Sequence, residues 1–348
     1  MFKPKMQLRQ LVRMAAALVG VALLVSLIRR TGPSTVVGQI RTVGWGVALV
    51  IGLGGISHLT KTLAWRFTFL CDVRNVSFAR TFGLRLVSEA IGSFGLPGQV
   101  LGETARVYFL GSALPVANSI SSVTLDRGLY IATSALVSVA GIITGLFLLP
   151  LSRTWRLYAS FFASVLALVV VLTAVGFQRR WPVFSGAARM LGRLPWFPKK
   201  LEDKQSIIDS AEDNLFRFYH DAPKAFCASL VLNLACHGMA ILEVYILLQF
   251  MGARTNLAGA FVLEAFTKLI NVVGALNPGN FGTYEAGNII LTRLLGVAGS
   301  AGLTLGLCRR ARSLFWKGIG FLCLVAMSRS TEEPRRIVSV NHNAMEVS

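Results

Sequence analysis

Long uninterrupted runs of apolar residues dominate this chain and predict helices that cross a membrane. Residues 129–151 and 157–177 contain no charged side chain, and residues 225–251 have only one histidine and one glutamate among their ionisable groups. A helix needs about 20 apolar residues to span the hydrocarbon core of a bilayer. We therefore expect all three runs to be transmembrane helices.

Three further apolar segments complete the predicted crossings. Residues 11–28 follow a basic start, and because no small-residue cleavage site comes after them, we interpret them as a retained first helix rather than a signal peptide. Residues 43–63 form another predicted span, as do residues 294–327, although basic side chains lie in the middle of the latter. The pattern predicts an all-α polytopic membrane protein with six full transmembrane helices.

Two other apolar segments, residues 78–114 and 257–291, are interrupted by Pro-Gly and fit poorly as straight spans. Irregular backbone survives at membrane depth only where protein or a water-filled cavity satisfies its polar groups. We expect two re-entrant hairpins, each entering and leaving the membrane on the same side. Two ordinary kinked spans would give the same pattern, and that alternative stays open.

The two breaks resemble each other, and the second follows the first after 181 residues. Their residues are Pro97, Gly98, Gln99, Gly102 and Glu103 in the first break, and Pro278, Gly279, Asn280, Gly282 and Glu285 in the second. Three predicted crossings separate the hairpins, so they would enter from opposite sides. This predicts an inverted repeat, in which discontinuous helices build the binding site, as in many secondary transporters.

Six of the 16 acidic residues lie within the apolar segments, where an ionised side chain costs about 2.5 to 3.5 kcal/mol. These are Glu89, Glu103, Asp126, Glu243, Glu264 and Glu285. Helical spacing predicts that Glu103 pairs with Arg106 and Glu264 with Lys268. Asp126 and Arg127 are adjacent, so they should find partners on other helices. Arg309 and Arg312 should share one helix face.

The distribution of these charges suggests a polar cavity at membrane depth. The hypothesis is that Arg106, Arg127, Arg309 and Arg312 hold an anionic headgroup. Further predicted binding residues are Gln99, Glu103, Asp126, Asn280 and Glu285, and Glu89 and Glu243 are candidates for proton coupling. Interhelical pairing that fixes assembly is the alternative, and it is favoured for Glu264 with Lys268. His58 and His237 are interpreted as core residues.

Charge outside the apolar runs sets the expected orientation. The net charge is +19, but basic loops follow the positive-inside rule, so nucleic acid is not an expected partner. Loop 178–224 and the tail, residues 328–348, are expected in the cytoplasm together with the N-terminus. The loop also predicts one amphipathic helix, with a solvated connector as the alternative. The cysteines show no metal-ligand spacing, and no cofactor or metal site is expected.

Four sequence segments resemble a known family: LPGQVLGETARVYFL, LDRG, NPGNFGTYEA and RRARSLFWKGIGF. They are similar to the transmembrane, flippase-like domain of lysylphosphatidylglycerol synthase. The resemblance implies a flippase-like membrane domain over residues 1–327, in a bacterial inner membrane, without the soluble aminoacyl-transfer domain of the full-length synthases. Relatives with this architecture are linked to lipid or polyprenyl-linked glycan export.

These observations favour a lipid or lipid-linked headgroup translocase that is not an enzyme. No GxxxxGK[ST] segment is present to hold nucleotide phosphates, so we expect coupling to protons or to headgroup charge. A second interpretation is an accessory membrane subunit of a glycosyltransferase or lipid-modifying enzyme. An intramembrane enzyme is the third, and a homo-oligomer is compatible with all of them.

Overall fold

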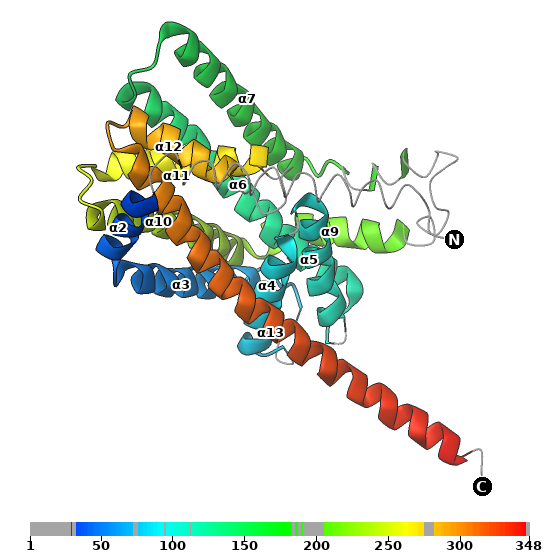
Figure 1. Ribbon diagram of the computed structural model, residues 1–348. Coiled ribbons are helices and arrows are strands. Elements are labelled where there is room, and N and C mark those ends of the chain that lie inside the picture. Colours follow the sequence, from blue (N-terminus) through cyan, green and yellow to red (C-terminus); the bar gives the residue numbers. More distant parts are fainter. Residues whose placement is uncertain are drawn as a thin grey trace, which may run out of the picture.

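The computed structural model describes residues 29, 33–71, 76–93, 95–111, 113–182, 185–186, 189–190, 205–274 and 282–345. All regular structure in these ranges is helical (Figure 1). The helices are α2 (Pro33–Val43), α3 (Gly46–Arg66), α4 (Phe78–Gly92), α5 (Gly95–Leu110), α6 (Val116–Leu148), α7 (Arg153–Gln178), α9 (Gln205–Asp221), α10 (Pro223–Phe250), α11 (Leu257–Gly274), α12 (Thr283–Leu294) and α13 (Gly299–Met345).

Five of the described helices are long and apolar enough to cross a membrane: α3, α6, α7, α10 and the first part of α13. They coincide with five of the six predicted spans, and the sixth, residues 11–28, lies outside the described residues. Helix α6 begins at Val116, earlier than the predicted start at 129, because its polar first half is buried against other helices. The chain is an all-α polytopic membrane protein.

The first predicted hairpin is a pair of packed helices, α4 and α5, joined by two residues. Ser77 caps α4, accepting a hydrogen bond from the amide of Arg80 at 3.1 Å. Pro97 lies in the first turn of α5, where the missing amide hydrogen would have had no partner within the helix. The break is therefore as predicted, while its position in the membrane stays a prediction.

A close approach of α4 and α5 explains Gly102. A Cβ atom at this position would lie 2.5 Å from the carbonyl oxygen of Ser88, closer than any packed side chain tolerates. Small residues allow such contact between helices in membranes. Gly102 therefore lets the second helix of the hairpin lie directly on the first.

The second half of the chain repeats the helices of the first. Shifting the bounds of α3 and α4 by 181 residues gives 227–247 and 259–273, which lie inside α10 and α11. Helices α12 and α13 then correspond to α5 and α6. The duplication seen at the two Pro-Gly segments therefore extends to four helices in each half, and α11 with α12 forms the second hairpin pair.

The two halves run in opposite directions. Gly46, at the start of α3, packs against Phe250 at the end of α10, and Ser57 in the middle of α3 accepts a bond from the Cys236 thiol. Helices α3 and α10 are therefore antiparallel neighbours (Figure 1). The first hairpin connects to one end of the bundle and the second to the other.

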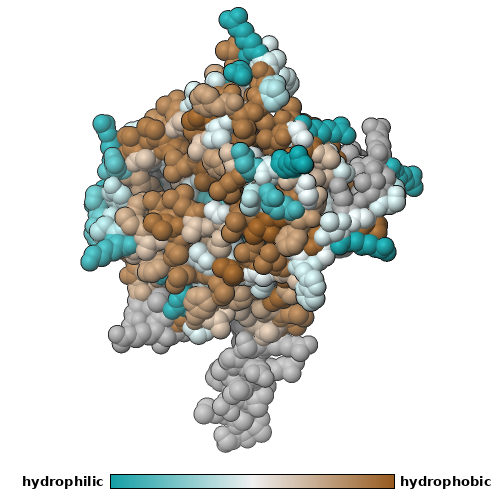
Figure 2. All heavy atoms as spheres, turned by 90° about the vertical axis from the view of Figure 1, so that its left-hand side faces the viewer, coloured by the Kyte–Doolittle hydropathy of each residue, from teal (hydrophilic) through white to brown (hydrophobic). Residues whose placement is uncertain are grey.

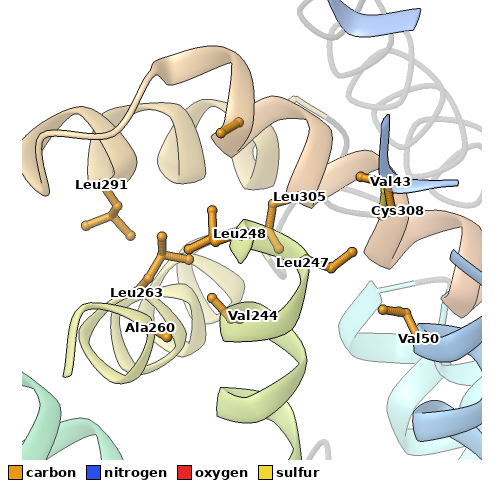
Figure 3. Close-up of a cluster of buried hydrophobic side chains, with 11 residues drawn as sticks. Val43, Val50, Val244, Leu247, Leu248, Ala260, Leu263, Leu291, Leu305 and Cys308 are labelled. Atoms are coloured by element: carbon orange, nitrogen blue, oxygen red, sulfur yellow. The ribbon is translucent and has the colours of Figure 1, made fainter. Parts of the chain in front are cut away.

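A buried apolar cluster joins the two halves (Figure 3). It contains Val43 of α2, Val50 of α3, Val244, Leu247 and Leu248 of α10, Ala260 and Leu263 of α11, Leu291 of α12, and Ala301, Leu305 and Cys308 of α13. Apolar side chains also cover much of the outer surface (Figure 2). Large exposed apolar areas of this kind are expected where lipid, rather than water, surrounds a protein.

Helix α9 is the amphipathic helix predicted in loop 178–224. Its apolar side chains Leu215 and Phe218 pack against Leu125 and Leu129 of α6. The helix is therefore fixed to the bundle rather than being a solvated connector, and its cytoplasmic location stays a prediction.

Candidate binding site

Five of the predicted site residues come together around one polar cavity, named cavity 1 here, with a volume of about 220 Å³. These five are Gln99, Glu103, Arg106, Asp126 and Arg127. Glu89, the predicted proton-coupling residue, also lines it. The remaining lining residues are Lys61, Arg85, Ser88, Gly92, Ser93, Tyr130 and Lys317. Cavity 1 thus lies where the first hairpin meets α3, α6 and α13.

A buried ion cluster forms one wall of cavity 1. Asp126 of α6 lies 3.1 Å from Arg85 of α4 and 2.8 Å from Arg106 of α5. Arg106 also binds Glu103 at 2.8 Å, the pairing predicted from their spacing, and its guanidinium lies 3.6 Å from the ring centre of Trp65. These contacts tie α4, α5 and α6 together. We had predicted that Arg106 holds a headgroup. Its guanidinium instead binds the carboxylates of Asp126 and Glu103.

Two other charged residues of cavity 1, Arg127 and Glu89, take no part in this ion cluster. Arg127 donates a hydrogen bond to Oε1 of Gln99 at 3.0 Å. Glu89 lies 3.5 Å from Nδ1 of His58 and 3.9 Å from Nζ of Lys61. Asp126 and Arg127 therefore have different partners on other helices, as their adjacency predicted.

A second polar cavity, named cavity 2, has a volume of about 190 Å³. It is lined by Ser57, Lys61, Tyr130, Cys236, His237, Ala240, Glu264, Lys268, Asn271, Tyr284, Arg309 and Arg312. The predicted residues therefore divide between two cavities instead of surrounding a single one. Lys61 and Tyr130 line both, so the cavities adjoin each other at these two side chains.

Three cations of cavity 2, Arg309, Arg312 and Lys268, are held in ion pairs. Arg309 lies 3.0 Å from Glu243 and 2.7 Å from Glu264, and Glu243 also pairs with Arg312. Lys268 lies 3.0 Å from Glu264, the i,i+4 pair expected from the sequence. Arg309 and Arg312 do share one face, and Glu243 of α10 is the carboxylate that joins them.

His237 is a buried residue with hydrogen-bond partners, as expected, and it also forms part of the polar wall of cavity 2. Its Nδ1 atom is 3.0 Å from Nζ of Lys268, and its Nε2 atom is 3.1 Å from the hydroxyl of Thr133. A lysine ammonium can only donate a hydrogen bond, so Nδ1 of His237 is the acceptor. The ring hydrogen is then on Nε2, which donates a hydrogen bond to the hydroxyl of Thr133. The ring is neutral in this arrangement.

Glu285 does not line either cavity, although we predicted it to bind substrate. Its side chain is fully buried and accepts bonds from the amide of Gly282 at 2.8 Å and from Arg310 of α13 at 2.6 Å. Gly282 itself has a positive φ of 76°, which favours glycine. This glutamate therefore fixes the start of α12 against α13. The other residues predicted at this break, Pro278, Gly279 and Asn280, lie outside the described residues.

Sequence reasoning missed several residues in and near the cavities. Lys61 and Tyr130 line both cavities, and Arg85 and Lys317 line cavity 1. Arg310 lies outside the cavities and binds Glu285. The burial cost that singled out the acidic residues applies equally to lysine and arginine in apolar segments. Applied to both signs of charge, the same argument finds all four basic residues.

The two halves place their buried charges differently. Glu264 and Lys268 of α11 lie 179 residues after Arg85 and Glu89 of α4, whereas the 181-residue shift places Arg85 at Phe266 and Glu89 at Ile270. In each half one of these residues binds the last helix of that half: Arg85 binds Asp126 of α6, and Glu264 binds Arg309 of α13. Both halves therefore contain such a bridge, with opposite sign and at positions that do not coincide.

In a comparison with protein families, the chain matches the lysylphosphatidylglycerol synthase TM region over residues 13–319. The matched segment includes both hairpins and both cavities. Comparison with curated proteins gave no match, and comparison with solved structures gave none either.

Proposed function

Because the chain belongs to the family of the lysylphosphatidylglycerol synthase TM region, we propose that it is a flippase-like translocase. The proposed substrate is a lipid or lipid-linked amphiphile. Its headgroup crosses through the polar cavities while its tails stay in the bilayer. The observation that carries this proposal is the presence of two adjoining polar cavities among helices that are apolar enough to span a membrane.

Charge placement supports a binding role for these cavities. Charged side chains within spanning segments are expensive, and they mark substrate or ion pathways more often than they serve stability alone. Here basic and acidic residues from α3, α4, α5, α6 and α13 converge on cavity 1. A headgroup would find polar partners on all sides there.

The arrangement of the halves suggests how access could alternate. One hairpin connects to each end of the bundle, and each also packs closely on a helix of the other half, α4 on α13 and α11 on α6. Rocking of one half against the other would open one cavity toward one leaflet and the other cavity toward the opposite leaflet. The headgroup would pass between them beside Lys61 and Tyr130. Re-entrant entry of both hairpins is part of this proposal.

Glu89 is a better candidate for proton coupling than Glu243. Glu89 faces cavity 1 with two contacts of 3.5 Å and longer, so it can gain a proton without breaking a tight pair. Glu243 is fully buried between Arg309 and Arg312. Protonating it would leave Arg312 without a carboxylate and Arg309 with Glu264 alone, which is much more expensive.

We propose no catalytic role for these residues. Within the described residues, no group of three His, Cys, Asp or Glu side chains could hold a metal ion. The proposed location is the bacterial inner membrane, with both termini in the cytoplasm. Because α7 exposes a large apolar surface, a homo-oligomer is also compatible with the proposal.

An accessory subunit of a glycosyltransferase or lipid-modifying enzyme is the second candidate. The closed ion pairs favour it, because Asp126 with its two arginines, and Glu285 with Arg310, act between helices of this chain. In that case the charges would serve assembly, and the partner enzyme would handle the lipid.

Reconstitution in liposomes tests the proposal directly. Purified protein is inserted into vesicles that contain fluorescent zwitterionic, anionic or polyprenyl-linked lipids, and exchange between leaflets is measured. We expect exchange above that of empty vesicles, reduced in Glu89→Gln and Gln99→Ala and retained in the exposed control Arg217→Gln. No exchange from folded protein with any headgroup would favour the accessory subunit.

A further inference from the structure

The cations that surround the two cavities differ in whether a carboxylate neutralises them. Arg309, Arg312 and Lys268 of cavity 2 all lie in ion pairs. In cavity 1, Arg85 and Arg106 are committed to Asp126 in the same way. A cation already paired and hydrogen-bonded gains little from a new anion, because the existing partner must first be displaced.

Three cations of cavity 1 have no carboxylate closer than 3.9 Å among the described residues. There, the side chain of Arg127 donates its hydrogen bond to the neutral amide of Gln99. Lys317 makes no hydrogen bond and no ion pair within 4.0 Å in the described part of the chain, and Lys61 lies 3.9 Å from Glu89. The charge of Glu89 acts on both lysines. These three side chains come from α6, α13 and α3 and line the same cavity.

The overall charge of cavity 1 is also positive. Five basic and three acidic side chains line it, which leaves an excess of two positive charges at neutral pH. The first turns of α5 contribute as well, because Gln99 brings the N-terminal end of this helix to the cavity wall. The N-terminal end of a helix carries a partial positive charge.

We propose that cavity 1 is an anion subsite that binds the phosphate group of a lipid headgroup through Lys61, Arg127 and Lys317. This inference rests on the proposed translocase function and specifies the substrate as an amphiphile with net negative charge at the headgroup. Arginine offers a planar pair of donors to phosphate oxygens, and lysine acts as a mobile point charge.

The size of the cavity limits what can accompany the phosphate. A volume of about 220 Å³ lies below the range of roughly 300 to 1,000 Å³ that is typical of pockets for drug-sized ligands. A phosphate with a small substituent fits this space, and an oligosaccharide does not. In this conformation the subsite therefore selects compact anionic headgroups.

Lys61 gives the subsite a route to cavity 2. Among the described residues, it is the one cation that lines both cavities. A phosphate bound in cavity 1 could stay with Lys61 while it leaves Arg127 and Lys317. Lys61 is thus proposed to keep contact with the headgroup throughout the passage.

Binding measurements on the purified protein test the subsite without transport. Isothermal titration calorimetry would compare dihexanoyl phosphatidic acid, dihexanoyl phosphatidylcholine and inorganic phosphate. We expect the phosphatidic acid to bind most tightly. Arg127→Gln, Lys317→Gln and Lys61→Gln should each weaken it about tenfold or more, the effect of losing one hydrogen bond to a charged group. Arg217→Gln, at an exposed site, is the matched control and should leave binding unchanged.

The outcomes separate this inference from the proposed function. Equal binding of the two lipids, or unchanged binding in all three folded variants, would overturn the subsite, even if vesicles show lipid exchange. Equal affinity for inorganic phosphate would assign the site to the free anion and overturn the lipid assignment. Selective binding that the variants weaken, without any exchange in vesicles, would support the subsite and count against translocation. Thermal unfolding of each variant checks its fold, and Arg127→Lys, which keeps the charge, should retain part of the affinity.

Discussion

The carboxylate of Asp126 lies 2.8 Å from Nη2 of Arg106, and both side chains are almost completely enclosed by protein. Arg85 approaches the same carboxylate from α4. One acidic residue thus pairs with two buried cations and connects both helices of the first hairpin to α6. The hairpin depends on Asp126 more than on any of the looser contacts around cavity 1.

Replacing Asp126 with asparagine should destabilise the protein strongly. Removing one partner of a buried ion pair costs about 3 to 5 kcal/mol, because the remaining charge stays buried without compensation. Thermal unfolding in detergent would measure the loss. Glu103→Gln is the matched control and should have a smaller effect, since Arg106 keeps Asp126 and the side chain of Glu103 retains 27% exposure. Equal stability of both variants would contradict the structural role of Asp126.

Replacing Gly102 with alanine tests the contact between α4 and α5. The new methyl group would meet the carbonyl of Ser88, and overpacking of this kind costs about 1 to 3 kcal/mol. Gly52 of α3 has open space around its Cβ position, so Gly52→Ala should be neutral or slightly stabilising. The midpoints of thermal unfolding compare the two. A tolerated Gly102→Ala would mean that the hairpin helices can separate freely.

Glu285→Gln tests whether this residue serves structure or substrate. The glutamine still accepts from the amide of Gly282, but it loses the ion pair with Arg310, so we expect a loss of about 2 kcal/mol. Asp221→Asn removes an exposed i,i+4 pair with Arg217 and should cost less than about 1 kcal/mol. Binding of phosphatidic acid should be unchanged in folded Glu285→Gln. Weaker binding with unchanged stability would place Glu285 at the substrate.

Labelling of single cysteines tests the inverted arrangement of the hairpins. Gly111 lies in the connection from α5 to α6, and Arg254 lies in the connection from α10 to α11; both are exposed. In a variant without the five native cysteines, Gly111→Cys and Arg254→Cys should react with a membrane-impermeant maleimide from opposite sides of the membrane. Inverted vesicles provide the control, in which the pattern should reverse. Reaction of both positions from one side would exclude the inverted topology.

The helices of this protein were largely predictable from sequence, and α6 shows where the prediction fell short. Its apolar second half satisfied the length criterion for a span, while its first half carries serines, Asp126 and Arg127. Hydropathy alone assigns such residues to a loop. Burial against α4, α5 and α9 allows them to continue the helix, and that tertiary context is not encoded in local pattern.

Only part of the membership of the site was predictable, and its division into two cavities was not. Pairs on one helix follow from spacing, and the two predicted pairs, Glu103 with Arg106 and Glu264 with Lys268, were found as expected. Pairs between helices do not: nothing near Arg310 in sequence points to Glu285, and nothing near Arg85 points to Asp126. The presence of two cavities instead of one depends on where Lys61 and Tyr130 project, which requires the packed bundle.

The different placement of charge in the two halves has an energetic consequence. In a translocase whose halves exchange conformations, an exact copy would make the inward-open and outward-open states equal in energy. Here the 181-residue shift that relates α4 to α11 puts Arg85 on Phe266 and Glu89 on Ile270, so the charges of the two halves do not coincide. The two end states of such a cycle would therefore differ in electrostatic energy. The empty protein would rest with a preference for one leaflet, set by its own charges before any gradient acts.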